Sequence, residues 1–505
     1  MASRTVNSMR NMVAAWAMQI ITMLLSFASR TVFVKLLPAE YLGLSGVFSN
    51  IISLLSLSEL GIGSAIIVNL YKPIANNDLR KVRQLMSFYA GAYRVIGLFV
   101  IACGIVLLPF IPYICKTDAP VNRMKWYFLV FVAQSASSYF FAYRRSILTA
   151  YQQEYICTIS TQACNILMNV LQIIALYLTR SYLLYLLVAI ATNIANNLFI
   201  YYVSGRKFPF LKGHMKDKLP KDERRGIFKD VGSMMVLKVG RVVVDSTDNI
   251  LISSYLGLVW NGLYSNYLLL ITTVNTFVNI VFNAISASVG DYNASKSSDE
   301  VYSLYKTTAF AGYWIYGFCS ICFAVLFQPF IMLWIGDQYL LDYATVLIVI
   351  INFYFAGMVR VSETFSYVAK LFHKTRKKGI VMAGVNLISS IILMRYLGLK
   401  GVFLGTVCGY AACGLWLDAY YLYKTTFKKH LYKYILSFAG NTAVVMIVGI
   451  VTYSVCQMFS NFIVKAALCI FVSNVLFMAI YFRTKEFKAI SKRLIGLIGS
   501  RMHRQ

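Results

Sequence analysis

The sequence is a succession of long apolar segments, and this feature constrains the fold more than any other. A helix needs about 20 apolar residues to cross a bilayer, and fourteen segments of the chain are long and apolar enough. With 59% hydrophobic and 13% charged residues, the chain lacks the polar surface that a water-soluble protein of 505 residues needs. We therefore predict an all-α polytopic membrane protein with about 14 transmembrane helices. Their expected ranges are 11–37, 44–71, 85–112, 126–149, 155–178, 182–204, 228–256, 260–289, 303–334, 343–369, 379–396, 400–423, 432–456 and 462–482.

The basic residues predict how these helices are oriented. The formal net charge is +29, and Lys and Arg gather in alternate connections, whereas the intervening connections are short or contain acids. Cytoplasmic loops of membrane proteins carry such an excess of Lys and Arg, so both termini are expected in the cytoplasm. The same distribution argues against nucleic acid as a partner. The apolar run after Arg10 continues to Leu37 without a small-residue cleavage site, so it is expected to be the first membrane helix rather than a signal peptide.

The segment 228–255 carries four charges that a membrane helix rarely holds. Steps of three, four and three residues place Lys238, Arg241, Asp245 and Asp248 on one face of a helix. Ionisable groups at membrane depth are costly unless they face a bundle interior or a wet cavity, so this face is a candidate functional site. Counting about 1.5 Å per residue, the two cations lie near the middle of the membrane and the two acids lie nearer the outside.

A short internal repeat suggests how the helices are grouped. Gly46, Ser49 and Asn50 recur with the same spacing 216 positions later, beginning at Gly262, and both copies open an even-numbered helix. This predicts two six-helix lobes related by a pseudo-twofold axis along the membrane normal, with two extra helices at the C-terminal end. The expected divisions are an N-terminal lobe at 1–205, a basic cytoplasmic linker at 206–227, a C-terminal lobe at 228–424, helices 13 and 14 at 425–483, and a basic cytoplasmic tail at 484–505.

Several stretches resemble polysaccharide and lipid-linked oligosaccharide flippases of the multidrug/oligosaccharidyl-lipid/polysaccharide (MOP) exporter superfamily. They include EYLGLSGVFSNIISLLSLSELGIGSAI from Glu40, DNILISSYLGLVWNGLYSNY from Asp248, PFIMLWIGDQYL from Pro329 and YLGLKGVFLGT from Tyr396. The resemblance covers about residues 10 to 435 and is weaker in the fourth to sixth helices. It implies a MATE-like fold whose lobes surround a central cavity, alternating access, and transport of an undecaprenyl-pyrophosphate-linked glycan to the outer leaflet of the bacterial cytoplasmic membrane.

Such a substrate suggests a role for the cations of the seventh helix. Lys238 and Arg241 would bind the pyrophosphate, Arg through its planar fork and Lys as a point charge. The alternative is that they pair internally with Asp245 one helical turn away.

The repeat also suggests a partner for the outer acids of this helix. It places Arg30 on the first helix at the depth of Asp245 and Asp248, so these groups could form an outer gate that opens when the lobes part. A static buried ion pair is the alternative.

A second set of charges lies in the expected membrane segments. Glu59 and Arg94 fall in the second and third helices, and Arg360 and Glu363 fall in the tenth. The cations would line the inward cavity and the acids would carry coupling protons or sodium ions; alternatively, Glu59 pairs with Arg94 and Arg360 pairs with Glu363.

Two further features of the helices have structural interpretations. Arg144 and Arg145 end the fourth helix, where they are interpreted as orientation determinants that contact anionic lipid rather than substrate. Gly43 and Gly46 are interpreted as sites of close helix packing, with bending as the alternative.

The sequence contains no recognisable catalytic or metal-binding set. The four histidines lie in expected loops or the tail, and the ten cysteines show no disulfide framework. We therefore expect no catalytic residues, no metal and no cofactor, and flipping requires none because no bond changes. The expected partners are a lipid-linked glycan, membrane lipid, a coupling H⁺ or Na⁺, and a polysaccharide polymerase as a further candidate. The alternative function is a cation-coupled multidrug exporter, whereas a glycan polymerase or ligase would need a long outer loop that the sequence lacks.

Overall fold

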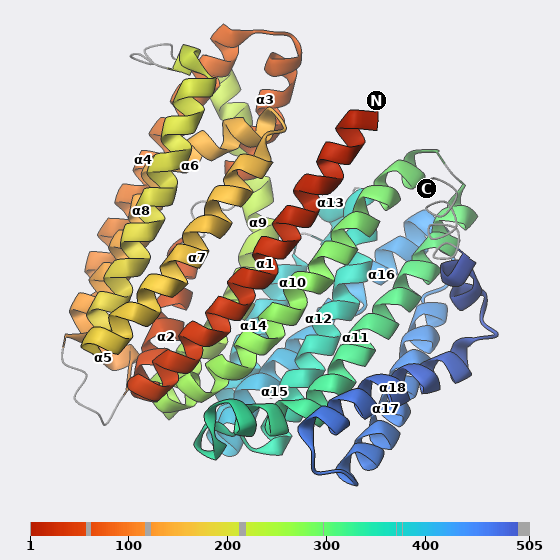
Figure 1. The fold of residues 1–505 in the computed structure, drawn as a ribbon. Helices are drawn as coiled ribbons and strands as arrows, with labels where there is room; N and C mark the ends of the chain where they lie inside the picture. The colour runs from red at the N-terminus through yellow and green to blue at the C-terminus, as the bar shows by residue number, and fades with distance from the viewer. Residues whose placement is uncertain are drawn as a thin grey trace. The chain divides into compact units, whose positions relative to one another are not determined.

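The computed structural model describes residues 2–56, 62–116, 123–211, 219–295, 297–369, 371–375 and 377–492. All regular elements in these ranges are helical, as predicted (Figure 1). Lipid offers the backbone no hydrogen-bonding partners, so a chain with these apolar segments must satisfy its N–H and C=O groups within helices. The described residues of the fourteen expected segments lie mostly on helix, and ten described helices are long and apolar enough to span a membrane. The remaining four expected segments fall on α2 (Ala39–Leu55) with α3 (Ile62–Ala75), on α6 (Met124–Ala150), on α9 (Lys221–Leu251) and on α10 (Leu258–Ser295).

Contacts divide the chain into two compact units, residues 1–262 and 263–505, and the boundary falls inside α10. The helices of the first unit, together with α10, are α1 (Ala2–Leu36), α2 (Ala39–Leu55), α3 (Ile62–Ala75), α4 (Leu79–Leu107), α5 (Ile111–Ile114), α6 (Met124–Ala150), α7 (Glu154–Thr179), α8 (Tyr182–Lys207), α9 (Lys221–Leu251) and α10 (Leu258–Ser295). Helix α9 packs against α2 and α3 in this unit. The division by contacts thus differs from the lobe boundaries expected from the sequence, which remain a prediction.

The second unit is built around α11, against which α12, α17 and α18 pack. Its helices are α11 (Ser298–Ile335), α12 (Tyr343–Val368), α13 (Phe372–Thr375), α14 (Lys378–Leu397), α15 (Leu399–Gly409), α16 (Leu417–Tyr421), α17 (Tyr432–Gln457) and α18 (Phe462–Tyr481). Two π-helical turns, η5 (Tyr410–Gly414) and η6 (Leu422–Phe427), flank α16. Helices α17 and α18 are the two extra helices expected from the sequence.

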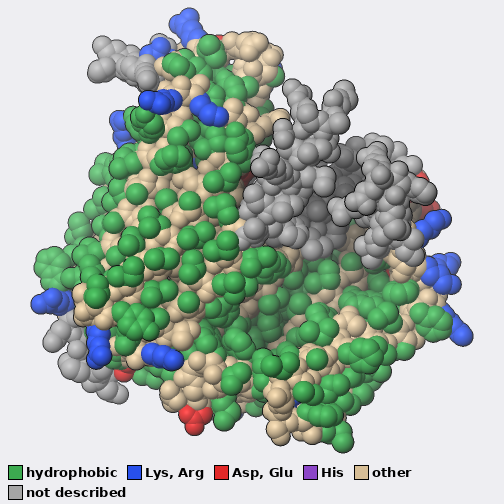
Figure 2. All heavy atoms as spheres, viewed as in Figure 1, with side chains coloured by type: hydrophobic (Ala, Val, Ile, Leu, Met, Phe, Trp, Pro, Cys, Tyr) green, Lys and Arg blue, Asp and Glu red, His purple; other side chains and the backbone are tan. Residues whose placement is uncertain are grey.

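Apolar side chains cover the sides of the helices on the face shown in Figure 2, and Lys and Arg lie at helix ends. Leu98, Val106, Leu178 and Phe199 are among the large apolar side chains of the first unit that are exposed. A core of buried apolar side chains from α3, α4 and α6, which includes Tyr89, lies within the first unit. Apolar side chains on the outer surface are what a lipid environment favours.

Gly43 and Gly262 are sites of close packing. A Cβ atom added to Gly43 of α2 would lie 2.1 Å from the Leu258 carbonyl oxygen, and one added to Gly262 would lie 2.4 Å from the Ala39 carbonyl oxygen. The Asn261 amide donates a hydrogen bond to the Gly43 carbonyl at 3.1 Å. The beginnings of α2 and α10 therefore approach backbone to backbone, which confirms packing as the role of Gly43.

We predict that Gly43→Ala lowers the melting temperature of the purified protein, because the new methyl group overlaps backbone that cannot move freely. Overpacking of this kind costs about 1–3 kcal/mol. Gly91→Ala is the matched control, since a Cβ there meets nothing within 4 Å, and alanine favours a helix over glycine by about 0.5–1 kcal/mol. Equal melting temperatures for the two variants would contradict the packing role.

Candidate functional site

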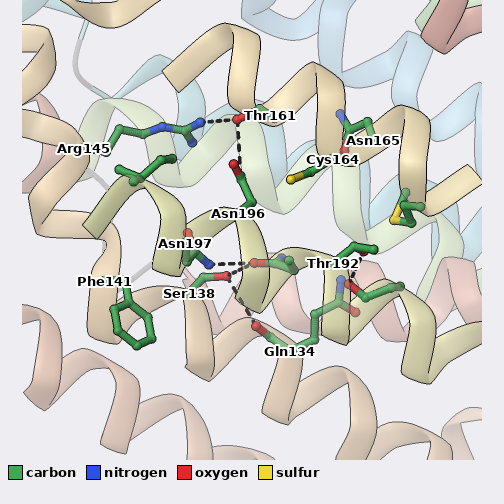
Figure 3. Close-up of a pocket in the computed structure, with 14 residues that line it drawn as sticks. Gln134, Ser138, Phe141, Arg145, Thr161, Cys164, Asn165, Thr192, Asn196 and Asn197 are labelled. Carbon is green, nitrogen blue, oxygen red and sulfur yellow. Dashed lines mark hydrogen bonds between the residues drawn. The ribbon is translucent and has the colours of Figure 1, made fainter. Parts of the chain in front are cut away.

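A polar pocket of about 350 Å³ lies between α6, α7 and α8 in the first unit (Figure 3). Neutral amide and hydroxyl side chains contribute most of its polar lining. These are Gln134 and Ser138 from α6, Thr161 and Asn165 from α7, and Thr192, Asn193, Asn196 and Asn197 from α8. Among the described residues that line the pocket, Arg145 alone carries a charge. A polar hollow within membrane helices is a place where polar groups of a ligand can be held away from lipid.

Helical spacing explains why the asparagines of α8 face the pocket. Asn196 and Asn197 follow Asn193 by three and four residues, so all three lie on one side of the helix. Leu187 and Phe199, on other sides of α8, are exposed. In lipid, the apolar side of such a helix faces outward and the amide side faces the bundle.

Hydrogen bonds hold part of the pocket lining in place. Asn193 Oδ1 accepts hydrogen bonds from Ser138 Oγ at 3.1 Å and from Asn197 Nδ2 at 2.7 Å. Thr161 Oγ1 accepts from Arg145 Nη2 at 2.5 Å and from Asn196 Nδ2 at 3.4 Å (Figure 3). These bonds link all three helices, so the pocket is a preorganised feature of this unit.

Other lining groups retain hydrogen-bonding capacity. The side-chain amides of Gln134 and Asn165 make no hydrogen bond with any residue in the described part of the chain. An amide carries two donor hydrogens and an acceptor oxygen, and burying it without partners is unfavourable. These side chains are therefore available to a polar ligand or to water.

The two arginines at the end of α6 have different environments. The Arg144 side chain is only 4% exposed, and its guanidinium lies 4.7 Å from the centre of the Tyr201 ring. The expectation that Arg144 contacts anionic lipid is therefore wrong, because its charge is held inside the unit by cation–π packing. Arg145 is exposed as a residue, but its guanidinium reaches Thr161 at the pocket.

Polar contacts continue along α1 and α7. Thr22 Oγ1 donates to Gln162 Oε1 at 3.0 Å, and Gln162 Nε2 donates to Gln19 Oε1. Nearer the other end of α7, Asn169 Nδ2 donates to Ser26 Oγ at 3.4 Å. The inner faces of the first-unit helices are thus polar beyond the pocket itself.

An ionic cluster is buried in the second unit. Lys378, at the start of α14, lies 2.9 Å from Glu363 Oε1 of α12 and also donates to Asp418 Oδ2 of α16. The Lys378 and Asp418 side chains are 7% and 4% exposed. This cluster therefore ties α12, α14 and α16 together.

A family model described as polysaccharide biosynthesis protein matches residues 8–286. The chain belongs to this family. No curated protein matches the sequence.

Three solved structures that resemble this polysaccharide biosynthesis family member are membrane transporters. The lipid II flippase MurJ in an inward closed conformation matches with a TM-score of 0.63 at 14% identity, covering 93% of this chain and 99% of MurJ. An inward-facing multidrug resistance MATE family transporter of the MOP superfamily gives 0.62 at 15% identity, covering 82% and 99%. A mutant of the Vibrio cholerae MATE transporter VcmN gives 0.57 at 13% identity, covering 86% and 100%. The chain therefore has the MATE-like fold predicted from the sequence.

The four charges of the seventh expected helix lie on α9. This helix is continuous from Lys221 to Leu251, but the side chains of Lys238, Arg241 and Asp245 lie outside the described part of the structure, as does Glu59. Asp248 is described and is half-buried. The roles assigned to these residues stay predictions.

The remaining expected site residues are spread over both units. Arg30 is half-buried on α1 and interacts electrostatically with Tyr185 of α8, whereas Arg94 is exposed on α4. Arg360 donates a hydrogen bond to Asn279 Oδ1 of α10. Glu363, the expected alternative partner of Arg360, instead forms its ion pair with Lys378.

Sequence reasoning missed the pocket asparagines and the Lys378–Asp418 pair in this polysaccharide biosynthesis protein. The spacing of Asn193, Asn196 and Asn197 was a usable signal, because it places three amides on one face of a membrane helix. Asp418, a single acid within an expected membrane segment, signalled that a buried cation must lie nearby. Lys378 was hidden because it belongs to a run of basic loop residues.

We predict that Lys378→Met strongly destabilises the protein, because it leaves the Asp418 carboxylate buried without its cation. Removing one partner of a buried ion pair costs about 3–5 kcal/mol, which a fall in melting temperature would report. Adding Asp418→Leu should recover most of the loss. The exposed neighbouring residue offers a matched control, Lys377→Met. If Lys378→Met and Lys377→Met have the same melting temperature, the cluster does not stabilise the unit.

Proposed function

We propose that the protein is a flippase that moves undecaprenyl-pyrophosphate-linked oligosaccharide repeat units from the inner to the outer leaflet by alternating access. The amide-lined pocket between α6, α7 and α8 is the observation that carries this proposal. Sugars crossing hydrocarbon need polar groups along their path, whereas the lipid tail can stay in the bilayer. Membership of the polysaccharide biosynthesis family supports a product such as capsule, exopolysaccharide or another surface polysaccharide.

The location and topology follow from the same proposal. The protein would span the bacterial cytoplasmic membrane with both termini inside, as its basic connections indicate. Two lobes, 1–205 and 228–424, would alternate around the substrate, and a polysaccharide polymerase would use the flipped product. The protein itself would catalyse no covalent reaction.

Lys238 and Arg241 are proposed to bind the pyrophosphate of the substrate. Their spacing places them on the same side of α9, which runs as a continuous helix through both positions. An anion as highly charged as pyrophosphate requires cations at mid-membrane, where water is scarce. Arg94 and Arg360 are proposed to line the inward cavity.

We predict that Arg241→Ala slows transport of a fluorescent lipid-linked oligosaccharide in proteoliposomes by about tenfold to a hundredfold. Charge-assisted hydrogen bonds contribute about 1.5–3 kcal/mol, and every 1.4 kcal/mol is a factor of ten. Lys221→Ala, an exposed cation at the first turn of the same helix, serves as the control and should transport normally. If Arg241→Ala transports at the rate of the control, Arg241 does not bind the pyrophosphate.

Arg30 is proposed to form an outer gate with Asp245 and Asp248. An ion pair that breaks when the lobes part is a two-state element that substrate binding can bias. The half-buried positions of Arg30 and Asp248 are consistent with groups that need a charged partner.

We predict that Arg30→Asp and Asp248→Arg each impair transport and that the double variant recovers at least part of the loss, because the exchanged charges attract again. Initial transport rates in proteoliposomes, normalised to the amount of folded protein, provide the measurement. A double variant no better than the poorer single variant would show that the two residues do not pair.

A coupling ion would supply the driving force. Glu59 and Glu363 are proposed to carry H⁺ or Na⁺, because acids at membrane depth are rare and commonly lie on ion pathways.

The second candidate function is cation-coupled export of small drugs, because multidrug MATE transporters share the fold. The neutral amide lining of the pocket favours sugars over apolar drugs. Deletion of the gene separates the two functions: loss of a flippase leaves lipid-linked repeat units in the inner leaflet, whereas loss of a drug exporter lowers drug resistance.

A further inference from the structure

We propose that the pocket between α6, α7 and α8 is a binding subsite for a sugar-like group that carries an anion. Arg145 would bind the anion, and the amides of Gln134 and Asn165 would bind hydroxyl groups. The chemical class of the ligand is inferred from the residues that line the pocket. Only its origin as part of a lipid-linked glycan rests on the proposed function.

The uncommitted amides indicate a ligand rich in hydroxyl groups. Gln134 and Asn165 come from different helices, both line the pocket, and neither side chain is hydrogen-bonded within the described part of the chain. A hydroxyl group donates one hydrogen bond and accepts two, so it matches an amide, which does both. Phe141 adds an apolar surface to the same lining, which suits the C–H face of a sugar ring.

Arg145 indicates that the ligand is also anionic. Its guanidinium donates to Thr161 Oγ1 at 2.5 Å and to the Cys157 carbonyl at 3.5 Å, both through Nη2. A guanidinium has five N–H donors, and the described lining contributes no carboxylate to this one. The remaining donors have the planar geometry that binds carboxylate or phosphate in a bidentate manner.

The size of the pocket limits what it can hold. Its volume of about 350 Å³ lies at the lower end of the ~300–1,000 Å³ that small-molecule sites occupy. It therefore suits a small part of a lipid-linked glycan rather than a whole repeat unit. The anion has two possible sources, the carboxylate of an acidic sugar and the pyrophosphate of the lipid carrier.

Binding to the purified full-length protein in nanodiscs tests the subsite and its anion source. Three probes are titrated: a glucuronate-containing disaccharide, a neutral disaccharide of the same size, and farnesyl pyrophosphate, which carries no sugar. We expect an anionic probe to bind more tightly than the neutral disaccharide, and Arg145→Gln to weaken that binding by about tenfold or more, since hydrogen bonds to charged groups are strong. Preference for the glucuronate probe identifies an acidic sugar, and preference for farnesyl pyrophosphate identifies the carrier.

Two further variants make the test specific. Asn165→Leu removes an amide without breaking a described side-chain hydrogen bond. It should weaken the binding of the glucuronate probe if the sugar occupies the pocket. Arg206→Gln removes the same charge from the end of α8 outside the lining and should leave binding unchanged. If Arg145→Gln does not fold, as judged by its melting temperature, Arg145→Lys and Asn165→Leu decide the question.

Binding and transport can fail separately. Absence of binding by both anionic probes, or binding that neither Arg145 nor Asn165 affects, overturns the subsite. Binding that depends on these residues, combined with no flipping in proteoliposomes, supports the subsite and overturns the proposed function.

Discussion

Lipid provides no hydrogen-bonding partners, and this constraint organises the whole protein. The backbone must be helical, and side-chain polarity must point inward. In the first unit, the amides of Asn193 and Asn197 face α6 and α7 while Phe199 is exposed on the opposite surface. In the second unit, Lys378 and Asp418 neutralise each other inside the helices. The interior of each unit therefore holds polar or charged groups that are screened from lipid.

The two units meet this constraint in different ways. The first leaves a hollow whose polar side chains are only partly hydrogen-bonded among themselves. The second holds packed aromatic rings, such as Phe323 against Phe327 with centroids 4.2 Å apart, and the Lys378 cluster. A hollow suits the binding of a polar ligand, and a packed ionic cluster suits a change in charge that alters helix packing. A division of labour between glycan binding and ion coupling follows from the proposed function.

The sequence predicted the helices well because hydrophobicity, the quantity that drives insertion, is local. It predicted the close contact at Gly43 because close packing is a common use of glycine in membrane helices. It failed where the outcome depends on which helices are neighbours. In the sequence Lys378 belongs to a run of basic loop residues, but in the fold α16 places Asp418 next to it. Arg360 and Glu363 have the spacing of a helical ion pair, but Arg360 contacts Asn279 and Glu363 contacts Lys378. The pocket was missed for the same reason, since its lining comes from three helices.

Under the proposed function, polar groups inside the helices carry a glycan head group across the membrane. The most direct measurement is the rate at which a fluorescent undecaprenyl-pyrophosphate-linked oligosaccharide, placed in the inner leaflet of proteoliposomes, becomes accessible to a glycosidase added outside. The account predicts that the wild-type protein increases this rate well above that of protein-free vesicles. It also predicts that the same vesicles do not transport a cationic dye. Dye transport without any gain in glycan accessibility would contradict the account and favour a drug exporter.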